Sequence, residues 1–228
     1  MKKLISLICV LAMVLALAAC GSSAPAAATE APAASTEAPA EDVSADKTFV
    51  VGICQLVQHP ALDAATQGFK DALTEALGDK VTFQEQNASG DSATCSLICN
   101  QFVSDEVDLI MANATASIQA AASATNTIPI LGTSITDYGV ALGVDNWTGV
   151  SGTNISGTSD LAPLDGQAAM IQELFPDAKT IGLLYCSGEP NSIFQADSME
   201  ALLTDMGYSV ERYTFADSND VSSVTANA

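Results

Sequence analysis

From residue 47 onward, short apolar runs alternate with segments in which apolar residues recur at helical spacing. An apolar run bounded by polar residues is typical of a strand buried on both faces, whereas apolar positions three or four apart indicate a helix. The predicted strands cover 48–57, 80–89, 107–114 and 127–135, and the helices between them cover 59–78, 90–106 and 115–126. This alternation predicts a parallel sheet wrapped by helices.

Residues 138–160 interrupt the alternation, because they are rich in Gly, Asn, Thr and Ser. We interpret them as the crossing into a second lobe, in which the alternation resumes. The predicted elements there are helices at 161–179 and 191–207, strands at 180–188 and 208–217, and the start of a helix at 218–228. The expected organisation is therefore a first α/β lobe at 47–150 and a second at 151–228.

The N-terminus has the pattern of a secretory signal. Two lysines precede a nearly continuous apolar run over 4–19, which is shorter than the roughly 20 residues of a typical membrane-spanning helix. The run ends in Leu-Ala-Ala-Cys, the pattern of a lipobox, so we expect a signal peptide at 1–19 and lipidation of Cys20. The alternative is an ordinary signal peptide with a chance cysteine. Stable anchoring at a membrane needs more than one acyl chain.

Residues 20–46 are low in bulky apolar residues and rich in Ala, Pro, Thr and Glu. Such a composition cannot offset the entropy of folding, so we expect a disordered tether between the lipid and the folded part.

The net charge argues against two classes of binding partner, and the cysteine spacing does not indicate a metal site. The chain has 27 acidic and 7 basic residues and a formal charge of −20, which argues against direct binding to nucleic acid or anionic lipid. Cys54 and Cys186 lie in apolar strand-like runs and are predicted to be buried thiols. Cys95 and Cys99 are four apart on a predicted helix, but no histidine or second cysteine pair completes a zinc pattern, so packing is the favoured interpretation.

The common catalytic and phosphate-binding signatures are missing from the sequence. His59 is the only histidine, so a nucleophilic triad would have to use it. Its place between a strand and Pro60 favours a loop or pocket-lining residue over a general base. The sequence predicts no enzyme, no metal site and no cofactor; a secreted hydrolase built on Cys186 or His59 is the weakest alternative.

Polar side chains follow four of the predicted strands. In open parallel sheets, ligands bind at the carboxyl ends of the strands. Hydroxyl and amide groups there adjoin helix N-termini, which favour an anion such as a carboxylate. Asp137, Asp160 and Glu189 are suited instead to an ammonium group. The combination predicts a small zwitterionic ligand, although some of these residues also fit the role of helix caps.

Several segments resemble ABC-transporter substrate-binding lipoproteins of the tryptophan/tyrosine-binding type. They are VGICQLVQHPALDAATQGFKDAL, ANATASIQAA, PILGTSITDYGVAL, GTNISGTSDLAPLDGQ and IGLLYCSGEPNS, which follow one another in the family's order. The resemblance implies a periplasmic-binding-protein type I fold with two α/β lobes and a ligand held in the cleft. It also implies further strands in the second lobe, so that lobe is expected to be incomplete here.

The resemblance also implies a site, a ligand class and partners. By position, the first lobe and the hinge would line the cleft with Gln55, Asn113, Thr115, Thr133, Ser134, Asp137 and Asp160, and the second lobe with Glu189, Asn191 and Ser192. The ligand would be an amino acid, aromatic type favoured. The partners would be the permease and ATPase of an importer, at the extracytoplasmic face of the cell membrane. The alternative is a membrane-tethered sensor domain that passes a signal to a partner.

Overall fold

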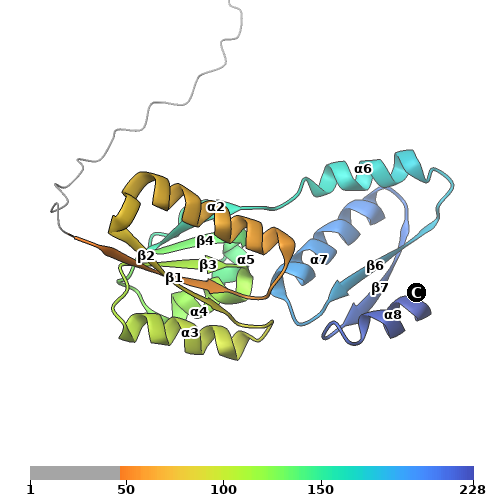
Figure 1. The fold of residues 1–228 in the computed structure, drawn as a ribbon. Helices are drawn as coiled ribbons and strands as arrows, with labels where there is room; N and C mark the ends of the chain where they lie inside the picture. The colour runs from red at the N-terminus through yellow and green to blue at the C-terminus, as the bar shows by residue number, and fades with distance from the viewer. Residues whose placement is uncertain (1–46) are drawn as a thin grey trace, which may run out of the picture. The chain divides into compact units, whose positions relative to one another are not determined.

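The computed structural model describes residues 47–228, and the predicted signal peptide, Cys20 and the tether lie outside that part. The described residues form two parallel β-sheets with flanking helices (Figure 1). No helix among them combines the length and the apolar character needed to cross a bilayer.

The first sheet has five parallel strands in the order β2-β1-β3-β4-β5. Their bounds are β1 Phe49–Gln55, β2 Val81–Asn87, β3 Leu109–Asn113, β4 Ile130–Ile135 and β5 Ile155–Ser159. The helices that connect them are α2 Pro60–Leu77, α3 Ser92–Ser104, α4 Thr115–Ala124 and the short α5 Tyr138–Leu142, and a 3-10 turn, η1, covers Gly78–Lys80. The α/β prediction for this lobe is therefore confirmed.

Helices cover both faces of this sheet, with α2 on one side and α3 and α4 on the other (Figure 1). Because side chains alternate along a strand, odd and even positions of β1 enter different cores. Val51 and Ile53 pack with Phe69 and Leu73 of α2. Cys54 packs on the opposite face, in the cluster of α3 and α4. Burial on both faces explains why this strand reads as one continuous apolar run.

The predicted limits of the first helix are confirmed. Pro60 occupies its first turn, where the missing N–H costs no intrahelical hydrogen bond. His59 precedes it as the N-cap, and its Nδ1 accepts a hydrogen bond from the N–H of Ala61 at 3.2 Å. Gly78 ends the helix with a φ of 57°, a left-handed value that glycine adopts without strain.

The second sheet has two parallel strands, β6 Thr180–Cys186 and β7 Ser209–Phe215. Its helices are α6 Leu164–Leu174, α7 Pro190–Asp205 and α8 Val221–Asn227. Ala168, Met199 and Leu203 form its small buried core. Each strand and helix predicted in this part of the sequence is present, and the bounds agree to within three residues, except that α6 ends five residues before the predicted helix.

The segment 138–160, which we interpret as the crossing into a second lobe, is not irregular throughout. It contains α5 and also β5, which pairs with β4 and belongs to the first sheet. Only Ile155 of β5 is buried, and the following residues Ser-Gly-Thr-Ser carry no apolar signal. The last strand of the first sheet therefore escapes detection by hydrophobic pattern, and the first sheet extends beyond residue 150.

Three of the four thiols are packed in the first core as predicted. Cys54, Cys95 and Cys99 are fully buried, and the sulfurs of Cys54 and Cys95 each lie 3.6 Å from Oγ of Ser117. The prediction for Cys186 is wrong, because this residue is only partly buried. It lies at the end of a strand in a two-stranded sheet, where fewer neighbours cover it.

Candidate ligand-binding site

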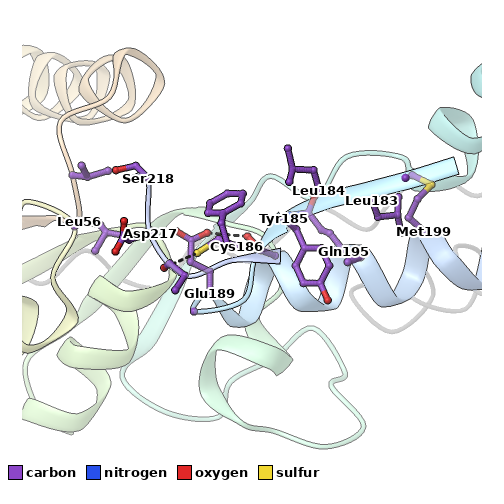
Figure 2. A pocket seen from close by; sticks show the side chains of 18 of the residues that line it. Leu56, Leu183, Leu184, Tyr185, Cys186, Glu189, Gln195, Met199, Asp217 and Ser218 are labelled. Carbon is purple, nitrogen blue, oxygen red and sulfur yellow. Dashed lines mark hydrogen bonds between the residues drawn. The ribbon is translucent and has the colours of Figure 1, made fainter. Parts of the chain in front are cut away.

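A cavity of about 950 Å³ adjoins the carboxyl ends of strands from both sheets (Figure 2). From the first sheet, the loop after β1 contributes Leu56 and Val57, and the loop after β2 contributes Ser89 and Gly90. From the second, the segments after β6 and β7 contribute Gly188, Glu189, Ala216, Asp217 and Ser218. A cavity of this volume with mixed polar and apolar walls is typical of a small-molecule site.

Glu189 and Ser192 lie in this cavity at the N-terminus of α7. The hydroxyl of Ser192 donates a hydrogen bond of 2.8 Å to Oε2 of Glu189, which holds the half-buried carboxylate in place. Pro190 follows at the first helical position and has no N–H. None of the lining residues is a lysine or an arginine. A ligand anion here would therefore rely on backbone N–H groups and hydroxyls, whereas a ligand cation would meet carboxylates.

Gln55 and Asn113 lie below the surface and belong to an internal network. The Nε2 of Gln55 donates to Oδ1 of Asp63 at 2.6 Å and to the carbonyl of Val57 at 2.9 Å. The hydroxyl of Thr66 donates to Oε1 of Gln55 at 2.7 Å and accepts from Nδ2 of Asn113 at 2.9 Å. Both amides thus fasten the ends of β1 and β3 to the start of α2. Gln55 also lines a smaller polar cavity of about 680 Å³ that shares Val57 and Ser89 with the first.

One atom of the network has no partner. The Oδ1 of Asn113 is buried without a hydrogen bond, while its Nδ2 donates to both Thr66 and the carbonyl of Leu62. Turning the amide over would place its oxygen against the Leu62 carbonyl, so the present orientation is the one that the neighbours favour.

Thr115, Thr133 and Ser134 lie at adjacent strand ends, because the N–H of Ala114 donates to the Thr133 carbonyl at 3.0 Å. Thr115 begins α4 and is buried. Ala114 precedes it with a φ of 84°, and Ser134 has a φ of 57°. Residues other than glycine rarely adopt this left-handed backbone conformation, and those that do are concentrated at functional sites. The turn after β3 and the end of β4 are therefore held in a strained but specific shape.

Asp137, Tyr138 and Asp160 lie together where β4 and β5 end. Oδ1 of Asp137 accepts a hydrogen bond of 2.8 Å from the N–H of Val140 and caps α5. The Tyr138 hydroxyl donates toward the carbonyls of Gly132 and Thr158, which bridges the register break between the two strands. Burial, together with the charge of Asp160, raises the pKa of Tyr138 to about 12.

The structure thus places the ten predicted residues in three groups. Glu189 and Ser192 line the larger cavity, and Gln55 lines the smaller one. The remaining seven line neither of these two cavities, although the first-lobe members lie at the carboxyl edge of the first sheet. They are Asn113, Thr115, Thr133, Ser134, Asp137, Asp160 and Asn191.

Sequence analysis missed the residues that follow β2 and β7. Ser89 comes two residues after the end of β2, and Asp217 and Ser218 come after β7. The rule that was applied to four strand ends would have found them at these two as well. Leu56 and Val57 were missed because apolar residues after a strand do not stand out as ligand contacts.

Within residues 47–228, no group of three or more His, Cys, Asp and Glu side chains has the arrangement of a metal site. His59 is exposed and is used as a helix cap, so it lines neither cavity.

Comparison with known proteins identifies the family. The sequence profile of the family described as ABC transporter substrate binding protein matches residues 50–228. A curated protein named Tyrosine-binding protein, from Clostridioides difficile (strain R20291), is 40% identical over 174 residues, which is 75% of this chain and 50% of that protein.

Two solved structures extend the comparison. The ABC domain of a Streptococcus pneumonia protein in complex with L-Trp is 32% identical with a TM-score of 0.74. The ligand-free, open structure of a substrate binding protein with adhesive properties from Clostridium difficile is 39% identical with a TM-score of 0.58. Each match covers 79% of this chain and 62% of the other.

This chain spans about half the length of the curated relative, and less than two thirds of the two solved structures. Its fold class is that of the type I periplasmic binding proteins, as predicted. The chain belongs to the ABC transporter substrate binding protein family.

Proposed function

We propose that the chain is an extracytoplasmic solute-binding lipoprotein of an ABC importer that captures an amino acid, with aromatic amino acids favoured. The observation that carries the proposal is the cavity of about 950 Å³ at the carboxyl ends of strands from both sheets. Support for the ligand class comes from the relatives, one of which is named Tyrosine-binding protein and another of which is described in complex with L-Trp.

The cavity has a feature for each part of an amino acid. The carboxylate of Glu189 suits an ammonium group, and the backbone N–H groups at the N-terminus of α7 suit a carboxylate. Leu56, Val57 and Phe215 provide apolar surface for a ring. Polar groups fix the orientation of the ligand, and the apolar wall supplies the larger part of the binding free energy.

The other predicted residues have two roles in this proposal. Gln55 and Asn113 shape the loop after β1 through the Thr66 network and do not need to touch the ligand. The polar residues at the remaining strand ends are proposed to meet the ligand from the first sheet or to hold the chain that leads to the second. They are Thr115, Thr133, Ser134, Asp137, Asp160 and Asn191.

Binding would couple to closure. A ligand that contacts both the residues after β1 and β2 and the residues after β6 stabilises the closed arrangement, in which both lobes contact the ligand at once. In this proposal the two lobes are 47–160, one strand longer than the sequence boundary, and the part from α6 onward. The closed form would deliver the ligand to a membrane permease and its ATPase.

The proposed location rests on the N-terminal sequence. A signal peptide at 1–19, a lipid on Cys20 and a tether over 20–46 would hold the binding part at the outer face of the cell membrane. Two or more acyl chains give such an anchor its stability.

A thermal-shift screen against the twenty amino acids, followed by calorimetry, tests the ligand class. An aromatic amino acid is expected to stabilise the chain by about 2.7 kcal/mol at a concentration one hundred times its Kd. If no amino acid shifts the transition and calorimetry detects no heat, the proposed ligand class is refuted.

The matched variants are Glu189→Gln and Glu173→Gln. The first removes the carboxylate from the cavity while keeping its shape, and we expect at least about a tenfold rise in Kd because a charged hydrogen bond is lost. The second changes an exposed carboxylate on α6 that does not line the cavity, and it should leave Kd unchanged. Equal affinities for the two variants would remove Glu189 from the site.

A further inference from the structure

Three buried thiols lie together on one face of the first sheet. Cys54 belongs to β1, and Cys95 and Cys99 belong to α3, where their spacing of four residues places both on the helix face that packs in the same core. All three are 0% exposed. The amino-acid site proposed above uses none of them, so the cluster has no role in that function.

Cys54 and Cys95 contact the same side chain. The sulfur atoms of both lie 3.6 Å from Oγ of Ser117, a buried hydroxyl on α4. The sulfur of Cys99 lies instead 4.0 Å from the backbone carbonyl of Ser117. Because one small hydroxyl touches both sulfurs, Cys95 is the better placed of the two α3 thiols to reach Cys54.

A glycine allows α3 to approach β1 closely. A disulfide spans only about 4.4–6.8 Å between Cα atoms, so it requires the helix to lie near the strand. A Cβ at Gly52 would lie 2.6 Å from the ring of Phe102, which therefore packs directly on the strand backbone. Gly52 and Cys54 face the same side of β1, and Phe102 and Cys95 lie two turns apart on one face of α3. The close contact at Gly52 thus also brings the backbone of α3 near Cys54.

The same packing makes these thiols unreactive in the folded chain. A hydrogen bond with Cys95 lowers the pKa of Cys54, but the contact with Cys99 and burial outweigh it and raise that pKa to about 12. The neighbouring Cys54 thiol and burial raise the pKa of Cys95. Because only a thiolate attacks a disulfide, neither sulfur reacts while the core is closed. Coupling of the two therefore belongs to the stage at which the chain folds.

We propose that Cys54 and Cys95 are a disulfide-forming pair, which a small disulfide oxidises during folding, and that the resulting bond fastens α3 to β1. One cysteine thiolate attacks the small disulfide, expels a first thiol and forms a mixed disulfide. The second cysteine thiolate attacks the cysteine sulfur of this mixed disulfide and expels the second thiol. The two cysteines lose two electrons in all, and their two protons end on the two expelled thiols.

The pair adjoins two loops that line the larger cavity. The loop after β1 is held to the loop after β2 by two backbone hydrogen bonds, in which the N–H groups of Ala88 and Gly90 donate. Cys54 is the last residue but one of β1, and Cys95 lies in the first turn of α3, just after the second loop. A bond between them adds a covalent link beside these hydrogen bonds. Its occurrence in cells rests on the proposed extracytoplasmic location, where disulfides persist, whereas its chemistry does not.

Refolding followed by peptide mapping tests the proposal on the full chain. The chain is diluted from urea into buffer with hydroxyethyl disulfide, the remaining thiols are alkylated, and trypsin then cuts after lysine and arginine. Cys54 lies in the tryptic fragment 48–70, and Cys95 and Cys99 lie in the fragment 81–179. We expect mass spectrometry to find these two fragments joined after refolding and separate after reduction.

Two matched serine variants assign the pair. Cys99→Ser should still give the joined fragments, whereas Cys95→Ser should give at least about tenfold less of them. The oxidised chain should have an equilibrium constant for unfolding at least about tenfold lower than the reduced chain, because the closed loop restricts the unfolded state. In the folded chain, the same reagent should modify the partly buried Cys186 and leave Cys54 and Cys95 free.

Three results would overturn the proposal. One is the absence of joined fragments after refolding, and another is fragments that persist in Cys95→Ser and vanish in Cys99→Ser. The third is an oxidised chain that is less stable than the reduced chain, because the bond would then not fit the core. Glu189→Gln should form the bond as the parent chain does, so a failure of the amino-acid ligand does not affect this test.

Discussion

Replacing Thr66 with valine removes a single hydroxyl from the network that joins Gln55 to Asn113. Valine has nearly the same shape, so the change leaves the packing of α2 against β1 and β3 in place. The hydroxyl both donates to Gln55 and accepts from Asn113, and Thr66 is only 3% exposed. Its loss leaves one buried acceptor and one buried donor without partners, because water has little access to either.

The magnitude follows from these two contacts. An ordinary hydrogen bond contributes about 0.5–1.5 kcal/mol net, and a buried group left unpaired costs about 1–3 kcal/mol. Since Asn113 keeps its bond to the Leu62 carbonyl and Gln55 keeps both of its donor bonds, relaxation will recover part of the loss. We expect Thr66→Val to lower the free energy of unfolding by about 2–4 kcal/mol.

Urea unfolding followed by circular dichroism measures this change as a shift in midpoint at constant slope. Thr82→Val is the matched control, because the Thr82 hydroxyl makes an exposed hydrogen bond of 3.3 Å to the Phe49 carbonyl. The control should change stability by less than about 0.5 kcal/mol. If Thr66→Val is no more destabilising than Thr82→Val, the network does not hold the strand ends, and the structural role given to Gln55 and Asn113 is wrong.

Three further predictions address packing, ionisation and anchoring. Gly52→Ala should destabilise the fold by about 1–3 kcal/mol in urea unfolding, because a Cβ there would lie 2.6 Å from the buried ring of Phe102. The control Gly68→Ala places its Cβ in open space on α2 and should stabilise the fold by up to about 1 kcal/mol. The reverse order of stabilities would contradict the packing around Gly52. The pKa of Tyr138 is raised to about 12, above the value near 10 of the phenol in the unfolded chain, so its contribution to stability is complete below about pH 10 and is lost toward pH 12 at up to about 1.4 kcal/mol per pH unit. The free energy of unfolding of Tyr138→Phe, measured across this pH range, should lack this loss. Parallel pH profiles for the variant and the parent chain would refute the assignment. Cys20→Ser should move the chain from the membrane fraction to the soluble fraction when cells are fractionated, and retention in the membrane would argue against a lipid at this residue.

Hydrophobic pattern predicts most of the fold because the strands of a parallel sheet are buried on both faces. β1 and β3 are apolar except for the last residue of each, and Pro60 and Gly78 mark the limits of α2, which follows β1. β5 shows the limit of the method. It lies at the edge of the sheet with one buried residue, so nothing in Ile-Ser-Gly-Thr-Ser separates it from a loop.

The site is less predictable than the fold because polar residues at strand ends have competing uses. Gln55 and Asn113 are residue types that often contact ligands, but their side-chain amides form hydrogen bonds with Thr66 instead. Thr66 lies within α2, and nothing in the sequence around it indicates that it contacts these two residues. Asp137 likewise caps a helix. Glu189 and Ser192 lie in the cavity as the strand-end rule indicates. Which residues face a ligand depends on helix packing that a one-dimensional pattern does not contain.

The most direct test of the central claim is an NMR titration of the isotope-labelled chain with an aromatic amino acid. The account predicts saturable amide shifts at two separate places in the sequence, after β1 and β2 around Leu56 and Gly90, and after β6 around Glu189 and Ser192. Saturable shifts confined to one of the two sheets, or no shifts at millimolar ligand, would contradict the claim that both sheets contribute to one ligand site.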